Sequence, residues 1–134
     1  MFFSKAIYFF VTFFAVASMI SVVVAEIQTS GTGRATFFTP SVGACGHTNT
    51  EDDFIVAIAS NVFQKALGGE KNPNNNPICN KKLTAKFKGK SVSVTIVDEC
   101  PGCGTDGLDL SPAAFKKLAD LSVGVLEGTT WTIS

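Results

Sequence analysis

Alternation of apolar and polar residues predicts β-structure in the second half of the chain. Every second residue is apolar from Leu83 to Lys88, and the same period recurs from Ser91 to Ile96, with Gly89 between the two runs. Such a pair of runs around a turn residue predicts a β-hairpin with one face on the core. Continuing the count places Asp98 on the buried face, where a carboxylate needs hydrogen-bond partners or a shifted pKa.

Shorter runs predict the remaining strands. Residues 33–39 (GRATFFT) form an expected first strand that Pro40 ends, and residues 54–59 (FIVAIA) form a continuous apolar run typical of a buried strand. A short strand carries Asp109, and residues 123–126 and 129–133 are expected to close the chain as strands separated by Glu127-Gly128. About six strands result, and a closed barrel would leave none of them with a free edge.

Two short helices are predicted between the strands. The first covers residues 61–67, with Ser60 or Asn61 as its cap and Gly68-Gly69 as its stop. The second begins at Ser111-Pro112, because serine is a good N-cap and proline is favoured at the first helical position. The fold class is therefore mainly β, with one or two short helices. Residues 70–77 (EKNPNNNP) are turn material and are expected to form a mobile surface loop.

The N-terminal 25 residues have the pattern of a secretory signal peptide. Lys5 is the only charge before Glu26, an apolar run follows it, and Val23-Val24-Ala25 supplies small residues for cleavage after Ala25. An uncleaved membrane anchor is the alternative, since the run approaches the length that spans a bilayer. Cleavage predicts a secreted protein, extracellular or in the cell wall, without a membrane segment, whose residues 26–134 form one domain. We expect a monomer.

Charge excludes one class of partner and leaves another open. Without Lys5 the chain has ten basic and eleven acidic residues, a net charge of −1, which does not favour nucleic acid as a partner. Five lysines nevertheless fall on the predicted hairpin, at positions 81, 82, 86, 88 and 90. They form either a solvated strand face or a patch for an anionic polymer.

All four cysteines lie after the predicted cleavage site, and an even number in a secreted chain predicts two disulfides. Cys100 and Cys103 are close enough in sequence to bridge, which would leave Cys45 with Cys79, although other pairings remain open. A zinc site built from cysteines and His47 is an alternative, but only one pair has ligand spacing. A thioredoxin-like redox pair would require a helix directly after Cys103, where Gly104 to Gly107 follow instead. We expect no metal and no cofactor.

The stretch from Val92 to Phe115 is the strongest candidate for a site, because it places Asp98 and Asp109 on either side of a Cys-Pro-Gly-Cys loop. Two nearby carboxylates are typical of general acid–base chemistry. Each can also be structural, since an aspartate just before a helix can accept backbone N–H bonds there.

Four blocks of this chain resemble the RlpA-like double-psi β-barrel superfamily, which includes barwin, expansins, inverting endoglucanases, bacterial lytic transglycosylases and small one-domain secreted proteins named after a papain inhibitor. The blocks are GRATFF (33–38), GACG (43–46), VTIVDECP (94–101) and LDLSPAAF (108–115). The resemblance implies a six-stranded double-psi β-barrel over nearly all of residues 26–134. It also supports pairing Cys45 with Cys79.

The resemblance further implies a ligand groove. Asp109 matches the general acid of the endoglucanases, an aspartate that bacterial expansins need for wall loosening. Asp98 and Thr36 match a second acidic position and a threonine beside that groove, while Phe38 lies near groove-lining positions of the first strand. Phe37 or Phe38 would stack on a sugar ring. The Asp and His that accompany the acid in the bacterial transglycosylases have no counterparts here. His47, the only histidine, lies on a different loop and is expected to be an ordinary loop residue. Trp131, the only tryptophan, is expected to pack in the barrel.

The chain departs from the endoglucanase pattern at one decisive point. Inverting glycosidases need a second carboxylate about 6.5–9.5 Å from the acid, and the first strand (ATFFTP), which supplies it in those relatives, contains none. We therefore expect binding or loosening of cell-wall polysaccharide without hydrolysis, although a weak transglycosylase would need only one principal acid. The alternative is a secreted inhibitor of papain-type cysteine proteases, or an effector, that binds protein through the loops 41–50 and 70–77.

Overall fold

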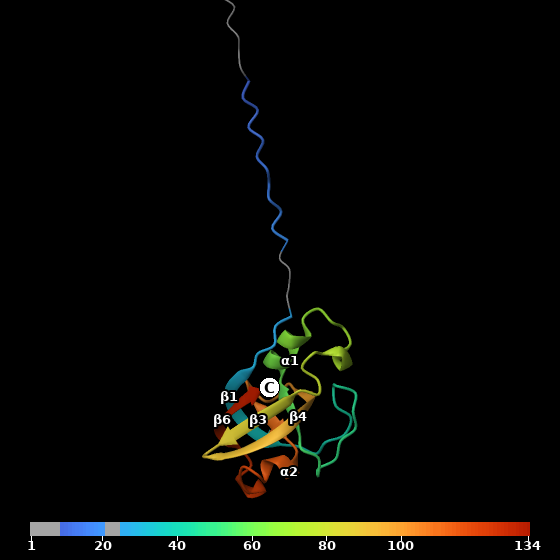
Figure 1. The fold of residues 1–134 in the computed structure, drawn as a ribbon, viewed down its shortest axis with the longest axis vertical. Helices are drawn as coiled ribbons and strands as arrows, with labels where there is room; N and C mark the ends of the chain where they lie inside the picture. The colour runs from blue at the N-terminus through green and yellow to red at the C-terminus, as the bar shows by residue number, and fades with distance from the viewer. Residues whose placement is uncertain (1–8, 21–24) are drawn as a thin grey trace, which may run out of the picture.

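The computed structural model describes residues 9–20 and 25–134, and within them six strands close into a barrel (Figure 1). The order around the barrel is β1-β5-β2-β4-β3-β6. The strands are β1 (Ser30–Phe37), β2 (Ile55–Ala59), β3 (Lys82–Phe87), β4 (Lys90–Cys100), β5 (Leu108–Leu110) and β6 (Leu126–Ile133). The predicted mainly-β barrel with two short helices is confirmed.

Two α-helices and two single 3₁₀ turns complete the described fold: α1 (Ser60–Leu67), η1 (Pro73–Asn75), α2 (Pro112–Phe115) and η2 (Leu121–Val123). The predicted cap of α2 is confirmed, because the Ser111 hydroxyl accepts a hydrogen bond from the Ala114 N–H at 3.3 Å. The predicted cap of α1 is wrong. Its N-cap is Ala59, and the Asn61 side chain is engaged elsewhere, exchanging hydrogen bonds of 2.8 and 3.1 Å with Asp106.

The predicted hairpin is formed by β3 and β4, with Phe87 opposite Lys90. Lys88 and Gly89 make the two-residue turn with φ angles of 45° and 79°. Positive φ at both central positions is the geometry whose twist matches that of the flanking strands. The hairpin is the yellow and gold ribbon at the front of the barrel in Figure 1.

The core is made of the inward-facing apolar residues of the strands and of the buried residues of α1 and α2, which lie at opposite ends of the barrel (Figure 1). Trp131 of β6 is the largest fully buried side chain, and its indole N–H donates to the Asp106 carbonyl at 2.8 Å. Gly31 leaves room for this ring, since a Cβ there would lie 2.5 Å from it. The predicted packing role of Trp131 is thus confirmed. Other large buried residues are Phe63, Phe115, Ile58, Ile78, Leu83, Ile96, Leu108, Leu110 and Leu126.

The prediction that Asp98 continues the buried face of β4 is wrong. Val56 of β2 pairs with Ile96, but the next residue, Ala57, pairs with Asp98, so Val97 is an extra residue in β4. Such a β-bulge shifts the alternation by one position. Asp98 consequently lies on the outer side of the barrel, in register with Ala57, whereas Ile96 and Val56 belong to the core.

The two closing strands predicted for residues 123–126 and 129–133 are one strand, β6, that begins at Leu126. Residues 121–123 form η2 instead. Opposite β1 the register shifts by one residue between Thr129 and Leu126, so Glu127-Gly128 forms a bulge, where Gly128 has a φ of 74°. The turn-like composition that suggested a break marks this bulge.

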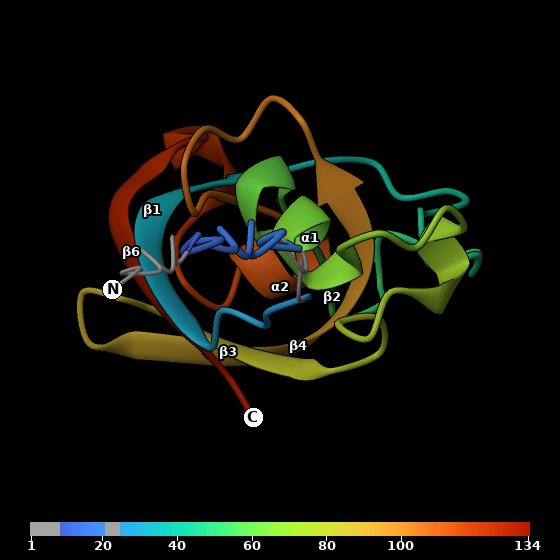
Figure 2. The same cartoon turned by 90° about the horizontal axis from the view of Figure 1, so that it is seen from above.

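Two disulfides, Cys45–Cys79 and Cys100–Cys103, confirm the expected pairing. The first ties the loop 41–54 to the loop 70–80, and the second closes the short turn after β4. Figure 2 shows both long loops on the same side of the barrel, away from the tip of the β3–β4 hairpin. At their contact, a Cβ on Gly46 would lie 3.0 Å from the Asn74 side chain.

Residues 9–20 carry no regular secondary structure, and their large apolar side chains are exposed. In the part of the chain that the structure describes, no helix is both long and apolar enough to cross a bilayer. The predicted signal peptide falls partly on residues 1–8 and 21–24, outside the described residues, and stays a prediction.

Candidate functional site

Strand register aligns the predicted site residues across four neighbouring strands. Thr36 of β1 pairs with Asp109 of β5, Asp109 pairs with Ala57 of β2, and Ala57 pairs with Asp98 of β4. We call these four residues the Asp109 row. The row lies on the outer side of the barrel, because Leu108 and Leu110 on either side of Asp109 point into the core. The structure therefore brings Thr36 of β1 into one row with Asp98 and Asp109, which lie more than sixty residues further along the chain.

Asp109 is half-buried and has an unusual environment for a carboxylate. The Thr36 hydroxyl donates a hydrogen bond to its Oδ1 at 2.9 Å. Its Oδ2 lies 3.9 Å from the Cys100 sulfur, which has no hydrogen to donate because it is bonded to Cys103. Desolvation raises the pKa of Asp109 above its ordinary value, and the negative charge of Asp98 raises it further, against the opposing effect of the Thr36 hydrogen bond. Asp109 is thus suited to holding or donating a proton.

Asp98 has a different role, because its Oδ1 is already occupied. This oxygen accepts hydrogen bonds from the backbone N–H groups of Ala44 and Glu99, both at 2.8 Å. Gly43 permits the close approach of the loop, since a Cβ there would lie 2.4 Å from the Val97 carbonyl oxygen. Asp98 therefore fixes the loop 41–54 against β4, and a carboxylate held in this way is poorly placed to activate water.

The disulfide turn beside Asp109 is held from β1. Arg34 donates from Nη2 to the Gly102 carbonyl at 2.7 Å. Ligand-type atoms of Cys100, Cys103 and Asp109 lie within 4.8 Å of one another. Both sulfurs are bonded to each other, however, and a metal requires thiolates. Asp109 alone remains of that group as a candidate ligand, which does not make a metal site.

The two phenylalanines proposed for the groove occupy different surroundings. Phe37 lies at the end of β1 and packs edge to face on Phe115 of α2, with ring centroids 5.0 Å apart. Strand alternation puts its side chain on the opposite side of β1 from Thr36. Phe38 is half-buried, and its backbone N–H donates to the Leu110 carbonyl at 3.1 Å. The structure therefore does not bring Phe37 together with Thr36 and Asp109.

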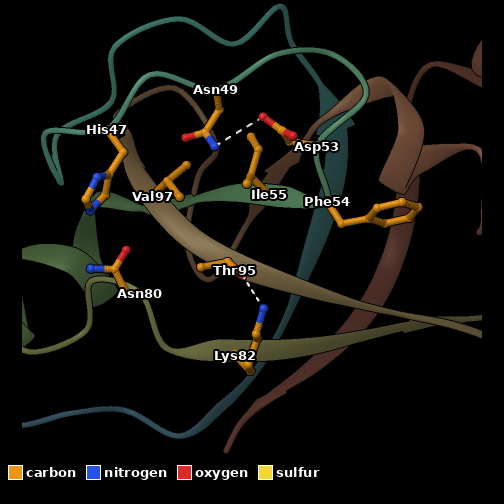
Figure 3. A pocket seen from close by; sticks show the side chains of 9 residues that line it. All are labelled: His47, Asn49, Asp53, Phe54, Ile55, Asn80, Lys82, Thr95 and Val97. Carbon is orange, nitrogen blue, oxygen red and sulfur yellow. Dashed lines mark hydrogen bonds between the residues drawn. The ribbon is translucent and has the colours of Figure 1, made fainter.

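An open hollow of about 400 Å³ lies two positions along β2 from the Asp109 row, beneath the loop 41–54 (Figure 3). It contains neither Asp98 nor Asp109. Some of its polar side chains are engaged with each other: Lys82 donates to the Thr95 hydroxyl at 2.6 Å, and the Asn49 amide donates to Asp53 at 3.3 Å. The full lining comprises His47, Asn49, Asp53, Phe54, Ile55, Asn80, Lys82, Thr95 and Val97.

No sequence pattern pointed to this hollow, because its residues come from four separate segments. His47, expected to be an ordinary loop residue, lines the hollow rather than the Asp109 row. Asp53 stabilises the loop that covers it. The Thr50 N–H and the Asn49 amide, in that order, lower the pKa of Asp53. Within the described residues the Asn49 Oδ1 is buried and has no hydrogen-bond partner.

The raised pKa of Asp109 has a consequence for stability that distinguishes it from a structural aspartate. The folded state holds this proton more tightly than the unfolded state, so stability is lost as the pH rises from about the ordinary aspartate value of 3.8 through the raised pKa. The Asp109→Asn variant has no proton to lose at this position. Its free energy of unfolding is therefore expected to rise relative to that of wild type as the pH increases through this range. Above the raised pKa, the difference between the two proteins should stay constant. Urea unfolding at a series of pH values measures it.

Asp52→Asn is the matched control, because Asp52 is exposed. The assignment would be contradicted if Asp109→Asn were less stable than wild type at neutral pH, as expected of a carboxylate that holds the fold together.

Comparison with known proteins places this fold in a family. The family model described as "Lytic transglycolase", a double-psi β-barrel model, matches residues 30–129. The chain belongs to the double-psi β-barrel family. A papain inhibitor from Streptomyces mobaraensis is 38% identical over 103 residues, which cover 75% of this chain and 68% of the inhibitor. The solved Streptomyces papain inhibitor has a TM-score of 0.71 at 34% identity, covering 81% of this chain and 98% of that one.

Expansins are a second group of double-psi β-barrel relatives. Expansin-like protein 1 from Dictyostelium discoideum is 31% identical over 110 residues, which cover 72% of this chain but 35% of the relative. A Clavibacter michiganensis expansin, solved in complex with cellohexaose, shares the fold with a TM-score of 0.62 at 24% identity, over 78% of this chain and 50% of that one. This double-psi β-barrel chain thus spans half or less of those two relatives.

Proposed function

We propose that this double-psi β-barrel protein is secreted and binds cell-wall polysaccharide at the Asp109 row without hydrolysing it. The observation that carries the proposal is the contrast between the two carboxylates of the row. Asp109 has a raised pKa and one hydrogen bond from a side chain, whereas Asp98 is occupied by two backbone N–H groups. One carboxyl group that can donate or accept a hydrogen bond suits a sugar hydroxyl or glycosidic oxygen.

Hydrolysis by inversion requires a base in addition to an acid. Asp98 is the only other carboxylate of the row, and its Oδ1 holds the loop 41–54 in place. The neighbouring acid, Glu99, accepts a hydrogen bond from Gln64 at 2.8 Å. The arrangement therefore supports recognition, with a hydrogen bond between Asp109 and a sugar oxygen, rather than activation of water. The two disulfides support secretion, since such bonds persist in oxidising compartments.

The test is retention on insoluble cellulose, chitin, β-glucan and peptidoglycan. Wild type is expected to be retained by at least one of them, and Asp109→Asn to lose about tenfold or more in affinity, as expected when one charge-assisted hydrogen bond of roughly 1.5–3 kcal/mol is removed. Asp52→Asn is the control with the same charge change. Equal retention of wild type and Asp109→Asn on every polymer would overturn the proposal, as would release of soluble sugar by the wild type.

Inhibition of a papain-type protease is the second candidate, favoured by one observation. The papain inhibitor of Streptomyces matches over nearly its full length, unlike the expansins. The contacts with the protease would be made by the loops 41–54 and 70–80, which the Cys45–Cys79 disulfide links. In a papain titration, Val42→Asp would then weaken inhibition, because Val42 is 69% exposed on the first loop, while Asp109→Asn would not.

A further inference from the structure

The tip of the β3–β4 hairpin carries positive charge that nothing in the described fold neutralises. Lys86, Lys88 and Lys90 are all exposed there. Among the described residues the only ion pair within 4.0 Å is that of Lys65 with Glu26, on another part of the molecule. Three ammonium groups within five residues therefore face solvent without a carboxylate partner, although the whole chain has no net charge.

The three lysines surround a hollow rather than a flat surface. A hollow of about 480 Å³ lies between the hairpin turn and β6, lined by the three lysines and by Phe87, Gly89, Ser91, Gly128 and Thr130. None of these residues is acidic. Glu127, which precedes Gly128, lines a separate hollow with Arg34. The hollow is thus lined by ammonium groups, hydroxyls and one aromatic ring.

The hairpin turn forms one side of this hollow, and β6 forms the other side. Lys88 sits in the left-handed conformation of the two-residue turn, and its ammonium lies 5.3 Å from the Phe87 ring centroid. This distance is within the range of a cation–π contact. A Cβ added at Gly128 would meet no surrounding atom within 4 Å, so the β6 side of the hollow is open.

Hydroxyl groups flank the lysines on the outer side of the barrel. Lys86 pairs with Ser91 of β4 on one side and with Thr130 of β6 on the other, and Thr130 pairs in turn with Thr32 of β1. The next row along the strands consists of Ser93, Thr84, Thr132 and Ser30. Most of these side chains are exposed, and within the described residues none of the hydroxyls of the two rows forms a side-chain hydrogen bond.

We propose that the hairpin-tip hollow and the adjoining hydroxyl rows form a second binding surface, for an acidic polysaccharide that carries carboxylates. The lysines would attract the carboxylates, and the serine and threonine hydroxyls would bond the sugar hydroxyls. Nucleic acid fits less well. The hollow contains no arginine to grip a phosphate with two hydrogen bonds, and its single aromatic ring is covered by Lys88. This surface shares no residue with the Asp109 row, which lies further along β1 and β4 and includes β5 and β2.

The test uses polygalacturonate as the probe and its fully methyl-esterified form as the neutral counterpart. The purified protein is expected to bind polygalacturonate more tightly than the ester, and added salt should weaken this binding because exposed charges are screened. Replacing Lys86, Lys88 and Lys90 together by glutamine should weaken binding by a factor of about three to about a hundred, because each exposed charge contributes only a small share. The same three positions changed to arginine should retain it.

The matched control removes three lysines elsewhere, Lys71, Lys116 and Lys117, all exposed. Loss of binding in the hairpin variant alone supports the proposal. Equal losses in both triple variants, equal binding of the methyl ester, or equally tight binding of double-stranded DNA would each overturn it. The triple glutamine variant should keep the retention on neutral polymers that Asp109→Asn weakens, so a failure at the Asp109 row and a failure at the hairpin tip are distinguishable.

Discussion

Replacing Cys45 and Cys79 together by alanine is expected to lower the free energy of unfolding by about 4 kcal/mol, because the disulfide closes a loop of 34 residues whose entropy the unfolded chain would regain. For a domain of this size that is a large part of the total, which is typically about 5–15 kcal/mol. Urea unfolding followed by far-ultraviolet circular dichroism measures the change.

The second disulfide provides the comparison. Cys100 and Cys103 are only three residues apart, so the same reasoning gives a loss of about 2 kcal/mol or less for their joint replacement. Equal losses from the two double variants would contradict the view that loop closure in the unfolded state is the main contribution. The Cys45–Cys79 variant should also free the loops 41–54 and 70–80 from each other, and faster amide exchange there would report it.

Trp131→Ala is expected to cost about 3–5 kcal/mol, because it empties the largest fully buried volume in the barrel. Trp131→Phe separates packing from hydrogen bonding. It keeps a ring in place but leaves the Asp106 carbonyl without the indole N–H, and is expected to cost roughly 1–3 kcal/mol. Circular dichroism is the appropriate measurement, since Trp131 is the only tryptophan and its fluorescence is lost in both variants.

Val123→Ala is the control for these substitutions, because Val123 is 55% exposed and a surface change of this kind usually alters stability by less than about 0.5 kcal/mol. If Trp131→Ala cost no more than this control, the central position of the indole in the core would be contradicted.

Alternation and turn chemistry predicted the parts of the fold that depend on neighbouring residues. The β3–β4 hairpin and the Ser111 cap are both local, and both are confirmed. The errors occurred where the direction of a side chain depends on pairing between strands that are distant in sequence. The bulge at Val97 is defined by β2 and the bulge at Glu127-Gly128 by β1. Neither bulge has an unambiguous mark in its own strand, so simple counting put Asp98 on the wrong face.

The same distinction applies to the candidate site. Asp109 and Asp98 could be named from the sequence because one short segment contains both, and the family resemblance added Thr36. Their different environments could not be predicted. Asp98 is occupied by the Ala44 N–H from a loop more than fifty residues away, and Asp109 is desolvated beside the Cys100–Cys103 disulfide. The hydroxyl rows around Lys86 likewise become a surface only when β6 and β1 lie beside the hairpin.

The order of strands around the barrel also bears on how the chain can be made. Both neighbours of β1 come from the C-terminal end of the sequence: β5 at residues 108–110 and β6 at residues 126–133. The chain is synthesised at about 5–20 residues per second. The edges of β1 therefore stay unpaired until β5 and β6 have been synthesised. Pairings this distant in sequence are slow to form. Until then both edges of β1 are open to pairing with other chains, which exposes residues 30–37 to edge-to-edge aggregation while the chain folds.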